Sequence, residues 1–249
     1  MPVIRSLVIA FATYSRIPMP RVDWSEENRR YTLCFFPLIG GVIGLFMWGW
    51  LYLCELLSIG PFLKGSLGAL LPLMITGGIH MDGFMDTTDA LASWQTRERR
   101  LEILKDSHVG AFGAMGCAGY LLLYAGLLSE MTAGQGIALI PVFVMSRALS
   151  AWALTALPSA RPKGMLDGFK QTARQRPVTL TSLGYLVICV FVWGFPLGVY
   201  ALLAASLCLV FYKRTALKHF GGVTGDLAGW FLQIAELALI AAILLRGKM

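Results

Sequence analysis

Three aspartates follow one another at helical spacing in the stretch 77–90, GGIHMDGFMDTTDA. At about 100° per residue, a helix places Asp82, Asp86 and Asp89 on one stripe roughly 60° wide. Aspartates at this spacing weaken a helix through low propensity and through like-charge repulsion, which a bound cation would relieve. Because hard carboxylate oxygens without cysteine or paired histidines favour Mg²⁺, the stripe predicts a magnesium site and chemistry at phosphate. A solvated helix start is the plainer alternative.

Two further polar segments contain glycines that would leave backbone N–H groups free. They are 105–113 (KDSHVGAFG) and 221–226 (GGVTGD). Glycines at the start of a helix allow its N–H groups to contact a phosphate. Each segment also has a structural interpretation, in which Asp106 or Ser107 caps the following helix and Asp226 caps the last one.

Three histidines and an intramembrane arginine complete the polar candidates. His80, His108 and His219 lie near the ends of apolar segments, where histidine is either an interfacial polar residue or an acid or base. Arg147 lies near the middle of an apolar segment, where arginine is costly and normally faces a bundle interior or an aqueous cavity. It would hold a substrate phosphate or form an ion pair, and Glu236 has the same two interpretations.

The composition identifies the class of protein that positions these residues. Of 249 residues, 57% are hydrophobic and 14% are charged, and the mean hydropathy is +0.67, whereas soluble domains contain about 25% charged residues. The apolar runs are long enough for helices that cross a core of about 30 Å, and the alternation of a membrane barrel is absent. We expect an all-α, polytopic integral membrane helix bundle, one domain over 1–249, with about seven transmembrane helices (about six to eight).

The expected spans are the long apolar runs, and 7–14 is apolar but too short to assign. Gly40 and Gly44 have the GxxxG spacing of closely packed helices. Together with the glycines of 110–119, they would serve either contacts within the bundle or a homo-oligomer. The runs are 34–57, 67–81, 109–128, 137–157, two segments of 178–211 divided at 194–196, and 227–245.

Lysine and arginine set the expected orientation. Most lie in four segments that the positive-inside rule assigns to the cytoplasm. The intervening loops contain only Lys64, and the C-terminal Arg246 and Lys248 are the exception that this topology leaves outside. This topology explains the net charge of +7 without a nucleic-acid partner, and the active-site segments 77–113 and 219–226 would face the cytoplasm. The basic segments are 16–30, 95–108 (an expected interfacial helix), 161–176 and 213–225.

The three motifs, in this order and at this spacing, closely resemble the cobalamin synthase family, the adenosylcobinamide-GDP ribazoletransferases of the B12 pathway. The resemblance covers essentially the whole chain, including 13–18 (TYSRIP). It implies an enzyme that joins adenosylcobinamide-GDP to α-ribazole or α-ribazole 5′-phosphate and requires Mg²⁺. The ribazole 3′-hydroxyl would attack the phosphorus bonded to the cobinamide aminopropanol and expel GMP, giving adenosylcobalamin or its 5′-phosphate.

The resemblance also implies roles for single residues. It makes Asp82, Asp86 and Asp89 metal ligands, with Asp226 as an additional ligand. The catalytic candidates are Asp82, Asp86, His80 and His108, and the general base stays open among the histidines and aspartates. The candidate substrate contacts are Lys105, Asp106, Ser107, Gly110, Gly113, Arg147, Gly222, Thr224 and Gly225.

Three rival functions fit parts of the pattern. A membrane CDP-alcohol phosphotransferase also uses spaced aspartates and a divalent metal, but the local pattern here, D-G-x2-D-x2-D, lacks the Ala-Arg and the longer spacing of that motif. A transporter would use Arg147 and Glu236 along a path and predicts repeated halves, which the sequence does not show. A membrane scaffold leaves the acidic and glycine motifs unexplained.

Overall fold

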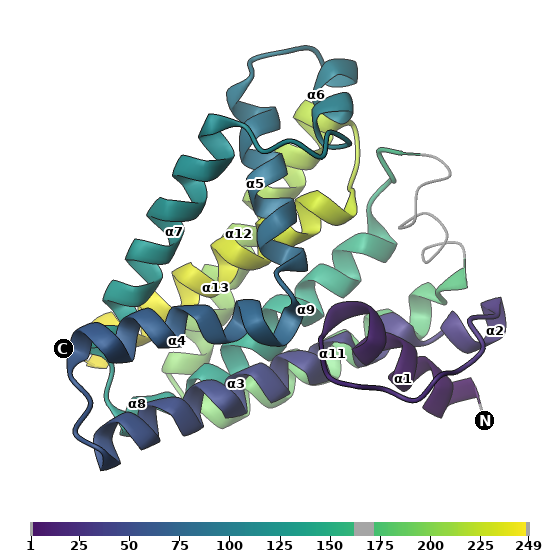
Figure 1. Ribbon diagram of the computed structural model, residues 1–249. Helices are drawn as coiled ribbons and strands as arrows, with labels where there is room; N and C mark the ends of the chain where they lie inside the picture. Colours follow the sequence, from purple (N-terminus) through teal and green to yellow (C-terminus); the bar gives the residue numbers. More distant parts are fainter. Residues whose placement is uncertain (1, 162–171, 248–249) are drawn as a thin grey trace.

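The computed structural model describes residues 2–161 and 172–247, and every element in these ranges is a helix (Figure 1). The all-α prediction is therefore confirmed for the described chain. The elements are α1 (Pro2–Tyr14), α2 (Glu26–Arg29), α3 (Thr32–Leu56), α4 (Pro61–Thr76), α5 (Ile79–Ala92), α6 (Arg97–Ile103), α7 (Ala111–Glu130), α8 (Ala133–Gly136), α9 (Leu139–Ala156), α11 (Gln175–Trp193), α12 (Leu197–Thr215), the π-helical η1 (Ala216–Phe220) and α13 (Gly225–Gly247).

All of the predicted membrane spans except 67–81 correspond to long apolar helices. Among the described residues, six helical segments are long and apolar enough to cross a membrane, and the bent pair α4 and α5 brings the number to seven. The expected division of 178–211 is confirmed, because α11 ends at Trp193 and α12 begins at Leu197. With 13 residues, α1 is shorter than these spans.

Close packing of α3 against α9 uses the predicted GxxxG pair. A Cβ on Gly40 would clash with the carbonyl of Phe143, and one on Gly44 would clash with the Cα of Ile140. The absence of side chains at these two positions lets the two backbones approach. These glycines therefore serve a contact inside the bundle.

We expect Gly40→Ala to destabilise the protein by about 1–3 kcal/mol, because the added methyl group meets backbone that cannot move aside. Chemical unfolding in detergent would measure the change. Gly49→Ala is the matched control on the same helix, since a Cβ there meets nothing within 4 Å. Equal stability of the two variants would contradict the packing explanation.

The expected continuous span over 67–81 is wrong, because the chain turns sharply at Gly77 and Gly78. Both glycines have left-handed backbone conformations, with φ of +68° and +79°, and α4 meets α5 at an angle of 100°. Such φ values favour glycine over any residue with a side chain. The side chain of Arg16 fills the space beside Gly77, and the Arg16 N–H donates to the carbonyl of Ile75 at 2.7 Å. The three aspartates consequently lie on a separate short helix.

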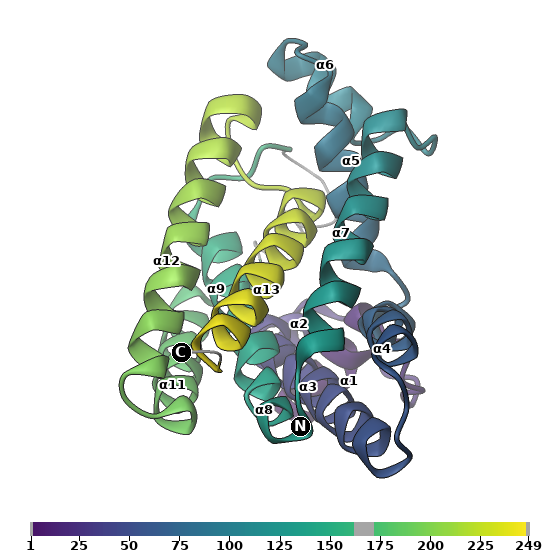
Figure 2. The ribbon, with the colours of Figure 1, turned by 90° about the vertical axis from the view of Figure 1, so that its left-hand side faces the viewer.

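The short helix α5 packs between α13 and α7 (Figure 2). Gly83 of α5 faces the backbone of Asp226, and Gly229 of α13 faces the backbone of His80, each so closely that a Cβ would come within 2.7 Å. This reciprocal pair of glycines brings the aspartate helix against the first turn of α13. Residues separated by about 140 positions in the sequence thereby form one surface.

Three of the predicted basic segments, 16–30, 95–108 and 213–225, lie away from the end of the bundle that holds α8, and most of the fourth, 161–176, falls outside the described residues. In Figure 1, α8, the turn after α3 and the C-terminal end of α13 lie at the left, whereas α6 lies at the top and α1 and α2 lie at the lower right. Arg100 of α6 contacts His219 of η1 at 2.7 Å between Nη1 and Nδ1, which joins two of the predicted basic segments. The orientation of these segments towards the cytoplasm stays a prediction.

Candidate active site

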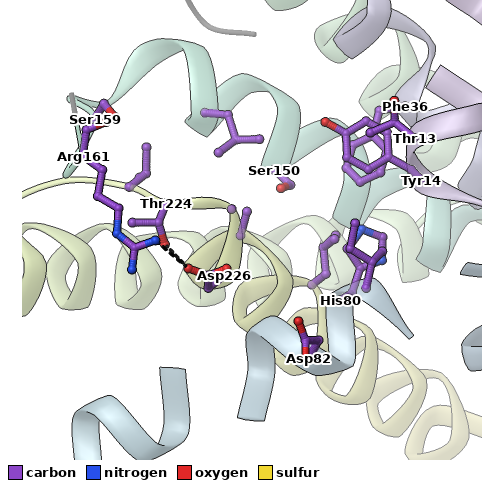
Figure 3. A pocket seen from close by; sticks show the side chains of 16 residues that line it. Thr13, Tyr14, Phe36, His80, Asp82, Ser150, Ser159, Arg161, Thr224 and Asp226 are labelled. Carbon is purple, nitrogen blue, oxygen red and sulfur yellow. Dashed lines mark hydrogen bonds and ion pairs between the residues drawn. The ribbon is translucent and has the colours of Figure 1, made fainter. Parts of the chain in front are cut away.

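A cavity of about 290 Å³ lies at the basic end of the bundle, where α1, α3, α5, α9 and α13 meet (Figure 3). One end of it is polar and the other is aromatic and aliphatic. Its residues come from segments far apart in the sequence, including two of the three predicted motifs. The labelled residues are Thr13, Tyr14, Phe36, His80, Asp82, Ser150, Ser159, Arg161, Thr224 and Asp226.

Asp226 and Arg161 form the polar end of the cavity. The Arg161 Nη1 atom lies 3.5 Å from Oδ2 of Asp226, and both side chains remain about one quarter exposed. The hydroxyl of Thr224 donates to the same carboxylate oxygen at 3.4 Å and accepts the N–H of Leu227 at 3.1 Å. Thr224 therefore caps α13, and the alternative in which Asp226 is the capping residue is wrong.

Backbone pairing positions Arg161 beside the GGVTGD motif. Ser159 and Val223 form an isolated parallel bridge, in which Val223 donates to Pro158 at 2.8 Å and Ala160 donates to Val223 at 3.0 Å. A Cβ on Gly222 would collide with this backbone, which explains the glycine there. The Arg161 Nη2 atom also donates to the carbonyl of Leu101 at 2.9 Å, so the guanidinium is held at two points.

The aspartate stripe divides into two parts. Asp82 is exposed and lines the cavity. Asp89 instead accepts the N–H of Gly110 at 2.8 Å and the N–H of Gly113 at 2.9 Å, one on each carboxylate oxygen. Asp86 is half-buried and close enough to Asp82, Asp89 and Asp226 to be repelled by their charges. Asp89 thus anchors the start of α7 to α5, and the two glycines are the partners of that anchor.

We expect Asp89→Asn to lower stability by about 1–2 kcal/mol, because an amide has a single acceptor oxygen and loses one of the two charge-assisted bonds. Thermal unfolding in detergent would show the shift. Asp23→Asn, in the exposed segment before α2, is the control. An unchanged midpoint for Asp89→Asn would contradict the anchoring role.

The other predicted contacts of the KDSH segment lie away from the cavity. Lys105, Asp106, Ser107 and His108 are exposed in the connection between α6 and α7. The Asp106 carboxylate accepts the backbone N–H of His108 at 3.0 Å and lies 2.7 Å from its Nδ1 atom. These hydrogen bonds hold the pKa of Asp106 below its usual value. Substrate contacts at these four residues stay predictions for a ligand that extends beyond the cavity.

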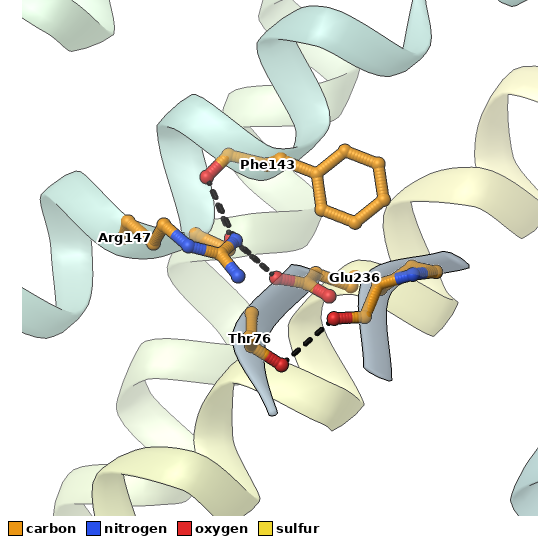
Figure 4. Close-up of polar contacts among 6 residues, drawn as sticks. Thr76, Phe143, Arg147 and Glu236 are labelled. Carbon is orange, nitrogen blue, oxygen red and sulfur yellow. Dashed lines mark hydrogen bonds and ion pairs between the residues drawn. The ribbon is translucent and has the colours of Figure 1, made fainter. Parts of the chain in front are cut away.

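Arg147 is enclosed in the bundle and is not among the residues that line the cavity. Its Nη1 atom lies 2.6 Å from Oε1 of Glu236 and donates to the Phe143 carbonyl at 3.2 Å (Figure 4). Ser146 donates to the same oxygen of Glu236 at 3.1 Å. Of the two interpretations open for Arg147, this geometry favours the ion pair, and a contact with substrate stays a prediction.

The remaining candidates fall near the cavity or at its rim. His80 is buried beside Tyr14 and Phe36 and lines the cavity, as Gly225 does.

The sequence-based prediction missed Arg161, Ser150 and Ser159. In the sequence, Arg161 is one of several basic residues in 161–176, whose charge the positive-inside topology already explained. The two serines are single polar residues that belong to no motif. Tyr14 belongs to the TYSRIP segment, whose resemblance to the family was the available signal.

The carboxylates suit magnesium in their chemistry. Within the described residues, no three His, Cys, Asp or Glu side chains converge as a complete metal site. Mg²⁺ is typically bound by one or two carboxylates together with waters and substrate phosphates, so a complete protein site is not required. Asp82 and Asp226, which line one cavity from facing helices, form such a partial set of hard oxygen donors.

The fold and the site define a polytopic membrane protein with a cavity lined by Asp82, Asp226 and Arg161, and the family and relatives that follow show that it is a transferase. The chain belongs to the cobalamin-5-phosphate synthase family, whose family model matches residues 6–244. This membership agrees with the resemblance carried by the three motifs, and it disfavours the transporter and scaffold interpretations.

The curated relatives carry one activity name. The chain is 44% identical over 248 residues to an adenosylcobinamide-GDP ribazoletransferase of Lachnoclostridium phytofermentans, covering 98% of this chain and 95% of the relative. It is 36% identical to the enzyme of that name from Desulfitobacterium hafniense, with 96% of each chain covered. For the relative from Brevibacillus brevis the identity is 31%, over 93% of this chain and 94% of the other. No solved structure matches the chain at a comparable significance.

Proposed function

We propose that this protein joins adenosylcobinamide-GDP to α-ribazole or α-ribazole 5′-phosphate, producing adenosylcobalamin or its 5′-phosphate and GMP. The names of the relatives support this reaction. The observation that carries it is the convergence of Asp82, Asp226 and Arg161 on one cavity, since a transfer at phosphorus needs carboxylates for a cation and a fixed positive charge for phosphate oxygens.

In the proposed step, the 3′-hydroxyl oxygen of ribazole forms a bond to the phosphorus attached to the cobinamide aminopropanol. The bond from that phosphorus to the oxygen bridging to GMP breaks, and GMP leaves with the bridging oxygen. The hydroxyl proton passes to a base in the cavity. His80 and Asp82 line the cavity, whereas His108 lies outside it, so we assign this role to one of the first two.

Fixed charges in the cavity would orient the reacting phosphate. The Arg161 guanidinium, which lies against Asp226 and donates to the carbonyl of Leu101, would contact phosphate oxygens. Such preorganised charge stabilises the transition state without reorganisation during the reaction.

Magnesium is part of the proposal. Asp82 and Asp226, with Asp86 beside them, would hold Mg²⁺ together with substrate phosphates. When bound, Mg²⁺ neutralises charge that develops on phosphate oxygens. Asp89 is the weakest of the proposed ligands, because each of its oxygens already accepts a backbone N–H.

We also propose that the protein is a multi-pass protein of the bacterial inner membrane with this cavity facing the cytoplasm. The basic residues of α6, η1 and the segment before α3 lie at the same end as the cavity, which the positive-inside rule assigns to the cytoplasm.

Exchange of the nucleotide substrate tests the proposed activity. Purified protein with Mg²⁺ should release GMP from adenosylcobinamide-GDP when α-ribazole is present, and should release no CMP from a CDP-lipid with an alcohol acceptor. Release of CMP without release of GMP would instead assign the CDP-alcohol phosphotransferase reaction and overturn the proposal.

A further inference from the structure

The end of the cavity opposite Arg161 and Asp226 has a different chemistry from the polar end. Tyr14 and Phe36 pack with ring centroids 4.5 Å apart, and the His80 ring lies almost parallel to Tyr14 at 6.3 Å. Figure 3 shows these three rings on the side of the cavity away from Arg161, and Leu154 and Leu232 add apolar lining to the cavity. Flat aromatic bases bind to such surfaces, because stacking on aromatic side chains needs only a π face.

One polar group points into this aromatic end without a partner. The Ser150 side chain is 1% exposed, and its hydroxyl has no hydrogen-bond partner among the described residues. Ser150 is one of the residues that line the cavity, and its hydroxyl oxygen is itself almost fully enclosed. A buried polar group without a hydrogen bond costs free energy, so a ligand with one suitably placed acceptor would recover that cost.

The size of the cavity limits what it can enclose. An engineered apolar cavity of about 150 Å³ accommodates benzene, and this one measures about 290 Å³. A two-ring aromatic base with part of its sugar fits such a volume, whereas a corrin ring does not. The corrin of the proposed substrate would therefore remain outside.

We infer that this end of the cavity, formed by Tyr14, Phe36, His80 and Ser150, is the subsite for the benzimidazole base of α-ribazole. The inference rests on the proposed function and assigns which of the two substrates enters the cavity. The base stacks on the aromatic side chains and its unsubstituted ring nitrogen accepts a hydrogen bond from Ser150. Its ribose then extends towards Asp82 and Asp226, where the 3′-hydroxyl reacts.

The guanine base of the other substrate fits this end less well. Guanine has several donors and acceptors along its edges, each of which needs a partner when buried. The polar atoms at the aromatic end are the hydroxyls of Ser150 and Tyr14 and the ring nitrogens of His80, because the Thr13 hydroxyl already donates to Ile9 at 2.7 Å. They are fewer than the polar atoms along the edges of guanine. A benzimidazole has a single ring acceptor and otherwise apolar edges, which matches this lining.

Separate KM values for the two substrates test the assignment. We expect Ser150→Ala and Tyr14→Leu each to raise the KM for α-ribazole about tenfold, as loss of one hydrogen bond or one stacking contact implies. The KM for adenosylcobinamide-GDP should stay within about twofold. Ser182→Ala, a buried serine of α11 outside the cavity, and Tyr120→Leu, a buried tyrosine of α7, are the matched controls.

An indole riboside, in which carbon replaces the accepting ring nitrogen, provides a second arm. With the unsubstituted protein it should bind about tenfold more weakly than α-ribazole, and this difference should disappear in Ser150→Ala. A raised KM for adenosylcobinamide-GDP alone, or no difference between the two ribosides, would overturn the subsite. A failure of the proposed function can be distinguished from a failure of the subsite assignment, because in the first case the unsubstituted protein would release no GMP.

Discussion

Asp82→Asn should reduce turnover about 100- to 1000-fold while the protein remains folded. Asp82 is exposed and lines the cavity, and its side chain makes no hydrogen bond to the described residues. We therefore expect the substitution to change the charge of the cavity without removing a contact of the fold. The amide has the same shape but cannot neutralise a cation or take up a proton. Initial rates of GMP release at saturating substrates measure the effect.

The matched comparison for this variant is Asp226→Asn, for which we expect a similar loss, because that carboxylate also holds Arg161. Asp23→Asn, outside the cavity, should leave the rate unchanged. Full Mg²⁺-dependent release of GMP by Asp82→Asn would remove this residue from the reaction.

Glu236→Leu should destabilise the bundle by about 3–5 kcal/mol, the cost of leaving a buried charge without its partner. Arg147 is 1% exposed, and its main ionic contact is the 2.6 Å pair with Glu236. Chemical unfolding in detergent and the yield of folded protein measure the loss.

The double variant Arg147→Met with Glu236→Leu separates the two interpretations of this arginine. Replacing both charges with apolar side chains of similar size should restore most of the stability, since no unpaired charge remains. If the pair is structural, the folded double variant should also retain catalytic turnover. A stable double variant without activity would show that Arg147 contacts the substrate instead.

The helical period was sufficient to predict much of the site. It placed Asp82, Asp86 and Asp89 on one face, and α5 contains all three. Hydropathy and the positive residues predicted the spans and brought the 221–226 motif to the same end, where Asp226 lies against Gly83. These features depend on local spacing and on the membrane as solvent, which the sequence contains directly.

Other features depend on contacts between distant segments. Gly77 and Gly78 tolerate a continuous helix as well as a break, and the 100° bend is set by packing of the Arg16 segment. Arg161 joins the site only because Ser159 pairs with Val223, and neither residue has a recognisable strand pattern. Asp89 matched its neighbours in type and spacing, yet its oxygens contact Gly110 and Gly113. Side-chain spacing alone does not distinguish a ligand from an anchor.

Coupling between the two substrates is the most direct test of the proposed reaction. Purified protein should form one adenosylcobalamin for each GMP released, detected together by mass spectrometry, and only when adenosylcobinamide-GDP, α-ribazole and Mg²⁺ are all present. Release of GMP at the same rate without α-ribazole would indicate hydrolysis, and it would contradict the account of a cavity that joins two substrates.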